Sequence, residues 1–269
     1  MKNWNESIIH ASQDFAARWG FLTKDLFFEF FCQMSQAQQY RYWNYLVEKN
    51  LFLVSKANTQ VLILSKKSRT QLGENARPAR SPFYITHDSL VARFILPLIQ
   101  RNLIERYWLE DELIRNPIDT YTVLGASRIH RIPDLVFDLR SVDGSSIRCA
   151  LEIETVTKAQ SRYAKIALAY ADYSKVSLIL FGCGYEATQR AVLNAFYKNG
   201  QSAQVIGVYK YQEFDATHLN SKIRFAGNEL SMRELLEALT KKPILDSESL
   251  RERNEKPFSL ITAENSEAA

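Results

Sequence analysis

The most constraining feature of the sequence is the region from residue 131 to 173, where polar and apolar residues alternate on both sides of one tight turn. Apolar side chains occupy every second position over Arg131–Leu139, and again over Ile147–Glu154. This period of two is typical of strands. The Asp143-Gly144 pair between them is a hairpin turn signal. The region therefore predicts two antiparallel strands, followed by a helix over Lys158–Tyr173.

Three carboxylates fall on one face of this predicted hairpin. Glu152 and Glu154 share the face opposite Ile153, and strand pairing brings Asp134 close to Glu152. Converging carboxylates repel one another unless a cation lies between them, and a divalent ion with oxygen ligands suits such a place. We therefore expect Asp134, Glu152 and Glu154 to hold Mg²⁺ or Mn²⁺. This requires that the acids share one side of the sheet and that no buried arginine already neutralises them.

The bulk composition fits a globular protein of one large domain or two modest ones. The chain has 269 residues, of which 46% are hydrophobic and 24% charged, and its net charge of +4 permits a polyanion partner without demonstrating one. No apolar run approaches the roughly 20 residues that span a bilayer. The N-terminus lacks the apolar centre of a signal peptide, so we expect a cytoplasmic protein. Cys32, Cys149 and Cys183 are isolated among apolar residues, which favours buried free thiols.

The first 73 residues predict a winged helix-turn-helix. Helices are expected over 5–19, 23–31 and 35–49, and the apolar segments on either side of residues 56–59 predict a hairpin. The third helix, whose inner face we expect to be Tyr40, Trp43, Leu46 and Val47, would enter the major groove of DNA. Winged helices also serve as dimerisation or docking modules, and a basic wing is also explained as a solvated edge. The predicted DNA contacts are Gln38, Arg41, Asn44, Tyr45 and Lys49 on the helix, with Lys56, Lys66 and Lys67 on the wing and its exit.

The rest of the chain predicts a second domain. Two prolines and the absence of apolar periodicity mark residues 74–85 as a linker, residues 86–245 as the second domain and residues 246–269 as a polar tail. The fold class is α/β (α+β) with a mixed central sheet. Beyond the hairpin, the expected elements are a helix over Ser89–Arg115 broken near Pro97, strands at Tyr121–Leu124, Val176–Phe181 and Ala203–Tyr209, and helices at Tyr185–Lys198 and Met232–Thr240.

The pair Pro133-Asp134, followed on the next strand by Glu152-x-Glu154, resembles the motif of the restriction-endonuclease-like nucleases. Their motif is written PD, a gap, then D/E-x-K, on a domain of order αβββαβ. Here Glu154 replaces the motif lysine, and Lys158 and Lys165 are candidates for a lysine moved onto the following helix. Lys158, Arg162 and Lys165 form one basic stripe, which suits DNA contact and equally a solvated helix face.

A narrower resemblance covers LEIETVTKAQSRYAKIALAY, which is similar to the E-x-E-x-x-x-K-x-x-x-R-Y signature of plasmid mobilisation proteins of the MobC relaxase type. These are akin to the broader replication-relaxation family, in which a winged helix precedes a nuclease-like domain. The resemblance implies that the chain acts in the transfer of a plasmid or integrative element. It would be a relaxase that binds origin-of-transfer DNA and nicks it, with a relaxosome or coupling protein as its partner. The alternative is a non-catalytic accessory factor or regulator that retains the nuclease fold as a scaffold.

The resemblance also implies catalytic roles. Asp134 and Glu152 would hold the metal ion, Lys158 would orient the attacking water, and Glu154 would take its proton or bind a second ion. Either Glu110 or Glu112 would complete the site. Other relaxases use a covalently attached tyrosine, but the helical spacing of Tyr163 and Tyr170 favours packing under the helix.

Overall fold

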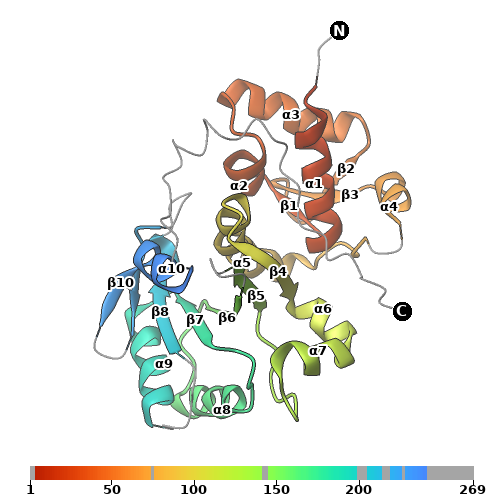
Figure 1. Cartoon of the computed structure of the whole chain (residues 1–269). Coiled ribbons are helices and arrows are strands. Elements are labelled where there is room, and N and C mark those ends of the chain that lie inside the picture. The colour runs from red at the N-terminus through yellow and green to blue at the C-terminus, as the bar shows by residue number, and fades with distance from the viewer. Residues whose placement is uncertain are drawn as a thin grey trace. The chain divides into compact units, whose positions relative to one another are not determined.

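The computed structural model describes residues 4–73, 76–140, 145–198, 205–213, 219–225 and 228–240 as a mixed α/β protein. The chain divides after Gln100 into two compact units (Figure 1). The predicted linker at 74–85 lies inside the first of them, because helix α5 (Pro82–Gln100) packs with the elements that precede it. Within this unit the side-chain amide of Gln100 donates to the Phe30 carbonyl at 3.0 Å, and Arg93 pairs with Glu29 at 3.0 Å.

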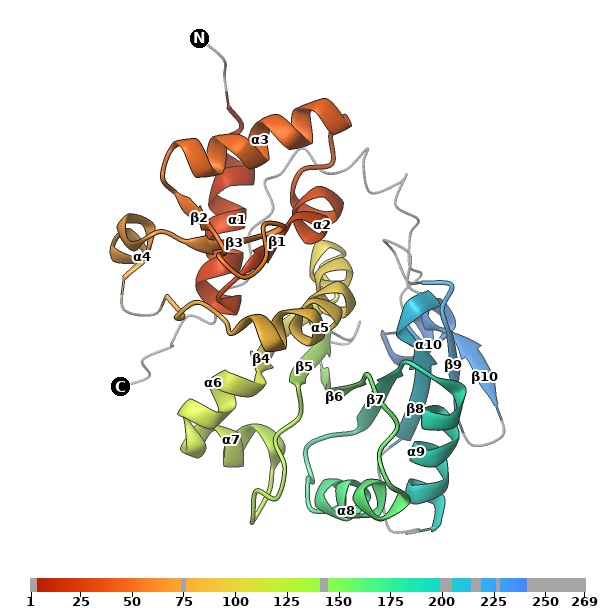
Figure 2. The same cartoon turned by 180° about the vertical axis from the view of Figure 1, so that it is seen from behind.

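The first unit combines helices with a small antiparallel sheet of order β1-β3-β2 (Figure 2). Strand β3 lies in the middle, with Phe52 of β2 opposite Leu64, so the predicted hairpin is confirmed. In chain order the elements are α1 (Glu6–Trp19), β1 (Leu22–Thr23), α2 (Lys24–Leu26) continued by a π-helical turn (Phe27–Phe31), α3 (Gln36–Glu48), β2 (Phe52–Val54), β3 (Val61–Leu64), α4 (Lys66–Leu72) and α5.

Capping residues explain why these helices begin and end where they do. The Asn5 side chain accepts from the Ser7 amide at the start of α1, and Gly20 ends that helix with a φ of 80°, which favours glycine. Ser35 and Gln38 form a capping box at the start of α3. Ser65 starts α4, a helix that the sequence reasoning did not predict. The caps of α1 and α3 are local signals, which is why the sequence predicts these two helix starts.

The buried face of α3 agrees with the prediction at Trp43 and Leu46, but Tyr42 is buried in place of Tyr40, and Val47 is only partly buried. Tyr42, Trp43 and Leu46 are buried, whereas Tyr40 is 42% exposed. The Lys24 ammonium lies over the Tyr40 ring, 4.2 Å from the ring centroid. The expectation that Tyr40 faces the core was therefore wrong. Its ring instead makes a cation–π contact at the surface.

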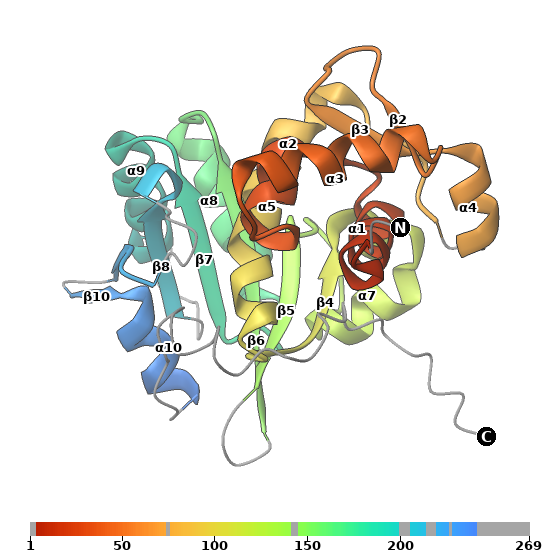
Figure 3. The same ribbon diagram turned by 90° about the horizontal axis from the view of Figure 1, so that it is seen from above.

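The second unit is built on a seven-stranded mixed sheet of order β10-β9-β8-β7-β6-β5-β4. Helices α8 and α9 lie side by side along one face of it (Figure 3). Strands β6, β7 and β8 are parallel, and the remaining pairs are antiparallel. The elements are β4 (Ile104–Leu109), α6 (Glu110–Arg115), α7 (Pro117–Leu124), β5 (Leu135–Arg140), β6 (Ser146–Glu154), α8 (Gln160–Ala171), β7 (Leu178–Cys183), α9 (Glu186–Lys198), β8 (Val205–Lys210), a 3₁₀ turn (Tyr211–Glu213), β9 (Lys222–Arg224), β10 (Glu229–Ser231) and α10 (Met232–Thr240).

Two elements before the hairpin were assigned wrongly. Residues 104–109 form strand β4, not the second half of a helix, and Tyr121–Leu124 belongs to α7, not to a strand. Asn116 caps α7 and Pro117 occupies its first turn, so the helix start overrides the local strand propensity. Pro97 lies inside α5, which continues past it to Gln100, so the predicted break at Pro97 was wrong.

Both faces of strands β5 and β6 are buried. An alternating pattern suggests that the acid-bearing face is open to solvent. All residues of β5 from Leu135 to Leu139 are nevertheless buried, so this face is covered. The crossover from β6 to the parallel strand β7 contains α8, and on this face Val136 and Ala150 pack with Tyr163 and Tyr170 of that helix. The acids of this face must therefore find partners inside the protein.

In the part of the chain that the structure describes, no helix combines the length and apolarity needed to cross a membrane. The predicted turn at Asp143-Gly144 and the predicted tail at 246–269 lie outside the described residues.

Candidate functional site

The candidate site lies where β5 begins and β6 ends. Leu135 pairs with Leu151, and continuing this register sets Asp134 opposite Glu152, as the sequence predicts. Asp134 Oδ2 accepts from the Ile153 amide at 2.7 Å, and its carbonyl accepts from the Glu110 amide at 3.2 Å. Asp134 therefore ties the ends of β4, β5 and β6 together.

Glu152 is the centre of a buried network. Its side chain is 1% exposed, and the Arg131 guanidinium grips it with Nε at 2.6 Å from Oε1 and Nη2 at 2.5 Å from Oε2. The Tyr170 hydroxyl, from α8, donates to Oε1 at 2.7 Å. The backbone of Arg131 exchanges hydrogen bonds with the Tyr173 hydroxyl, which fixes the segment before β5 against the end of α8. Both carboxylate oxygens of Glu152 are thus occupied by protein donors.

The electrostatics of Glu152 reflect competition between burial and pairing. Burial and, to a smaller extent, the nearby charge of Asp134 raise its pKa, Arg131 and Tyr170 lower it, and the net result is a pKa of about 7. Burial disfavours the charged guanidinium of Arg131, but its hydrogen bonds and the charge of Glu152 outweigh this and raise its pKa. Arg131 therefore stays charged, and Glu152 changes charge near neutral pH.

Glu154 has a cation of its own. Its side chain is 1% exposed, and the Lys158 ammonium lies 2.6 Å from its Oε1. The Lys158 amide donates to the Tyr163 hydroxyl at 3.2 Å, which holds the connection to α8 against the helix. The lysine that the sequence proposes to have moved from the motif position is thus brought to the acid that replaced it.

A second arginine–carboxylate pair on the same face was missed. Arg148 holds Asp138 with Nε at 2.7 Å from Oδ1 and Nη2 at 2.9 Å from Oδ2, and its Nη1 donates to the Val123 carbonyl at 2.6 Å. Arg106 lies 3.3 Å from the same carboxylate, which is 1% exposed. The signal was present, because the register that sets Asp134 opposite Glu152 also sets Asp138 opposite Arg148.

The three predicted metal ligands share one side of the sheet, but they are not gathered around a common vacant point. Arg131 and Lys158 already provide the positive charge that Glu152 and Glu154 require. Among the residues that the structure describes, no group of three or more His, Cys, Asp or Glu side chains is arranged to hold a metal ion. The arrangement does not fit Mg²⁺ or Mn²⁺ as it stands, since an ion would have to replace one of these cations.

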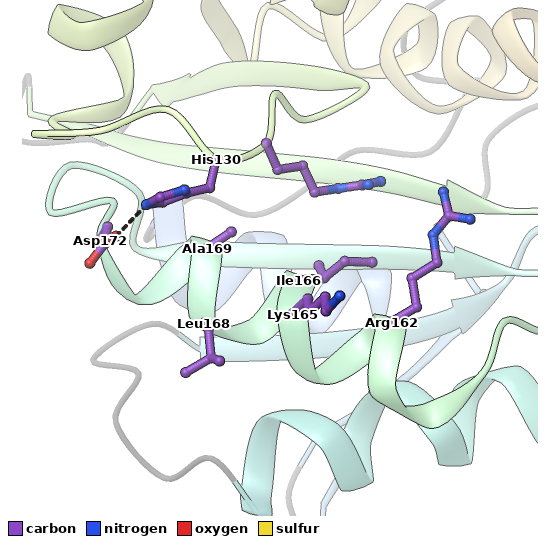
Figure 4. Close-up of a pocket in the computed structure, with 8 residues that line it drawn as sticks. His130, Arg162, Lys165, Ile166, Leu168, Ala169 and Asp172 are labelled. Carbon is purple, nitrogen blue, oxygen red and sulfur yellow. Dashed lines mark ion pairs between the residues drawn. The ribbon is translucent and has the colours of Figure 1, made fainter.

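The remaining predicted site residues lie nearby or serve the backbone. Glu112 accepts from the Leu109 amide at 2.9 Å as part of a helix cap, so it is engaged in starting α6. Arg162 and Lys165 are exposed on α8 and, together with His130 and Arg131, line a hollow of about 660 Å³ beside the acids (Figure 4).

The two tyrosines considered as nucleophiles are both fully buried under α8. Burial raises the pKa of Tyr163 to about 12, and burial together with Glu152 raises that of Tyr170 well above its ordinary value. Both hydroxyls stay protonated and make structural hydrogen bonds. The packing interpretation therefore suits this arrangement better than attack on a phosphate.

In the first unit, the predicted DNA contacts other than Tyr45 are exposed. Gln38 also caps its own helix through its Oε1, and Tyr45 stacks on Trp4 with ring centroids 4.1 Å apart. The residues exposed to solvent are Gln38, Arg41, Asn44 and Lys49 on α3, Lys56 in the turn between β2 and β3, and Lys66 and Lys67 at the start of α4.

Comparisons with protein-family models, with curated proteins and with solved structures found no match to this chain.

Proposed function

We propose that the chain binds double-stranded DNA through its first unit, acting as a winged helix-turn-helix, and serves a plasmid or integrative element as a non-catalytic accessory factor or regulator. The observation that carries the proposal is the division of α3 into two faces. Tyr42, Trp43 and Leu46 anchor the helix, while Arg41 and Asn44 are exposed one turn apart. Side chains of these two types read guanine and adenine edges in the major groove.

The surroundings of α3 support this role. The Tyr42 hydroxyl accepts from the Asn5 amide at 2.8 Å and Trp43 packs on Phe27, so the helix is rigidly placed. The sequence of elements and the sheet order β1-β3-β2 are those expected of a winged helix. Lys56 lies in the turn that would form the wing, where it suits a phosphate contact.

The test is duplex binding measured by fluorescence anisotropy at several salt concentrations. Removing a base-reading side chain by Arg41→Ala or Asn44→Ala is expected to cost about 1–3 kcal/mol. Lys56→Ala should weaken binding to all sequences and reduce the salt slope by about 1. Arg190→Ala is the matched control, because Arg190 is an exposed cation of α9. Wild-type affinity in all three α3 and wing variants would contradict the proposal.

The second candidate function is DNA nicking, and the position of Lys158 is what favours it. A lysine beside an acid pair at the end of two adjacent strands is the arrangement that the nuclease resemblance calls for, and Lys158 reaches Glu154 at 2.6 Å. Against it stands the engagement of both Glu152 oxygens by Arg131 and Tyr170.

A supercoiled-plasmid assay with added Mn²⁺ separates the two functions. If the chain nicks DNA, the wild type produces open circles, and Asp134→Asn or Lys158→Ala lowers the rate by about a hundredfold or more, as loss of one transition-state contact does. Arg190→Ala should leave nicking unchanged. Duplex binding without any open-circle product leaves the accessory role as the function.

A further inference from the structure

The hollow beside the acid network is lined by two cations, Arg162 and Lys165, that have no acidic partner among the described residues. It lies between α8 and the segment before β5, entirely within the second unit. Arg162 and Lys165 stand on the same side of α8 and His130 on the segment across from them (Figure 4). Within the described part of the chain, neither Arg162 nor Lys165 has an acidic partner, whereas Arg131 is paired with Glu152.

The charge and geometry of these groups suit a phosphate. Arg162 offers a planar fork of donors and Lys165 a compact ammonium, a combination that binds the oxygens of a phosphate with charge-assisted hydrogen bonds. The Asp172 carboxylate is on the opposite rim, where it lies 3.6 Å from His130 Nε2. Asp172 therefore pairs with the imidazole of His130 and not with Arg162 or Lys165. The side of the hollow formed by Arg162 and Lys165 keeps its positive charge.

The size and floor of the hollow suit a small organic ligand better than a lone ion. Its volume of about 660 Å³ is in the range of pockets that hold small organic ligands. Ile166, Leu168 and Ala169 provide an apolar surface next to the cations, and Leu168 is 52% exposed. A ligand that contacts both the cations and the apolar surface of the hollow would carry a phosphate at one end and a flat or apolar group at the other.

We infer that this hollow binds a nucleotide unit, with its phosphate held by Arg162 and Lys165 and its sugar and base lying over the apolar floor toward His130. The unit is either a free nucleotide or one nucleotide of a single strand, because both present the same phosphate ester. This site is separate from α3, so it does not depend on duplex binding by the first unit.

Calorimetric titration of the full chain at low salt tests this inference with three probes. These are thymidine 5′-monophosphate, thymidine, and a short oligothymidylate without terminal phosphates. The monophosphate, the oligonucleotide or both should bind, and thymidine should not. Binding of the monophosphate alone identifies a free nucleotide as the ligand, and binding of the oligonucleotide alone identifies a strand.

Two surface variants make the test specific. Arg162→Ala and Lys165→Ala replace exposed side chains with the best helix former, so α8 stays folded. Each should weaken binding about tenfold or more, as expected for loss of a hydrogen bond to a charged group. Arg190→Ala on α9 should bind as wild type does. The inference is wrong if neither phosphate probe binds, if thymidine binds equally well, or if the Arg162→Ala, Lys165→Ala double variant keeps wild-type affinity. The same double variant should bind duplex DNA through α3 as before, which separates a failure here from a failure of the proposed function.

Discussion

We expect the stability of this protein to fall as the pH rises through neutrality, and Glu152 is the reason. Burial, with a smaller contribution from Asp134, raises its pKa from an ordinary value of 4.5 to about 7. The folded state therefore holds a proton that the unfolded state releases earlier. The resulting stability is fully present below about pH 4.5 and is lost as the pH rises through 7. Because each pKa unit is worth about 1.4 kcal/mol, the total loss is about 3 kcal/mol.

The assay compares urea unfolding of the wild type with Glu152→Gln from pH 4 to pH 8. Glutamine keeps the shape and cannot titrate, so the stability of the wild type relative to the variant should fall by about 3 kcal/mol over this range. Glu48→Gln on α3 is the control, because Glu48 is exposed. A constant difference would refute the argument. A difference that increases with pH would mean that the attraction of Arg131 outweighs burial and that Glu152 is ionised throughout.

Three substitutions should each change the free energy of unfolding at pH 7, measured by urea titration against the wild type. Arg148→Ala leaves Asp138 buried without its bidentate partner and should cost about 3–5 kcal/mol; a cost below 1 kcal/mol would contradict a structural role for the pair. Tyr170→Phe removes the hydroxyl that donates to Glu152 but keeps the ring, and should cost about 1–3 kcal/mol. Gly182→Ala places a Cβ less than 3.0 Å from side chains of both neighbouring strands and should cost about 1–3 kcal/mol; wild-type stability would mean that these side chains move aside freely.

Local signals in the sequence predict much of this fold. The hairpin of β5 and β6 brings Asp134 opposite Glu152 as expected, because a slip by one residue would turn the apolar side chains to the other face. The caps at Asn5, Thr23 and Ser35 mark helix starts for the same local reason. Strand β4 was missed because its burial does not alternate, so its pattern resembles the amphipathic helix before it.

The candidate site was only half predictable. The acids of β5 and β6 share one side, which follows from register and alternation. That α8 covers this side depends on the handedness of a crossover and on contacts between residues far apart in the sequence, such as Tyr170 with Glu152. The pairing of Arg131 with Glu152 was not predicted, because it depends on the path of the segment before β5.

The position of Arg131 links the buried acid to the hollow beside it. One guanidinium both holds Glu152 and lines the hollow beside Arg162 and Lys165, so an anion bound there competes with Glu152 for the same positive charge. Breaking a buried pair by removing one partner costs about 3–5 kcal/mol, which corresponds to a factor of roughly 10² to 10⁴ in an equilibrium constant. A divalent ion acting alone would meet this cost in full. A phosphate held by Arg162 and Lys165 in the same hollow would also attract Arg131 and lower this cost, so any affinity of Glu152 for Mn²⁺ should be higher with the oligonucleotide bound than without it. Equal affinity in both cases would show that Arg131 does not couple the two places.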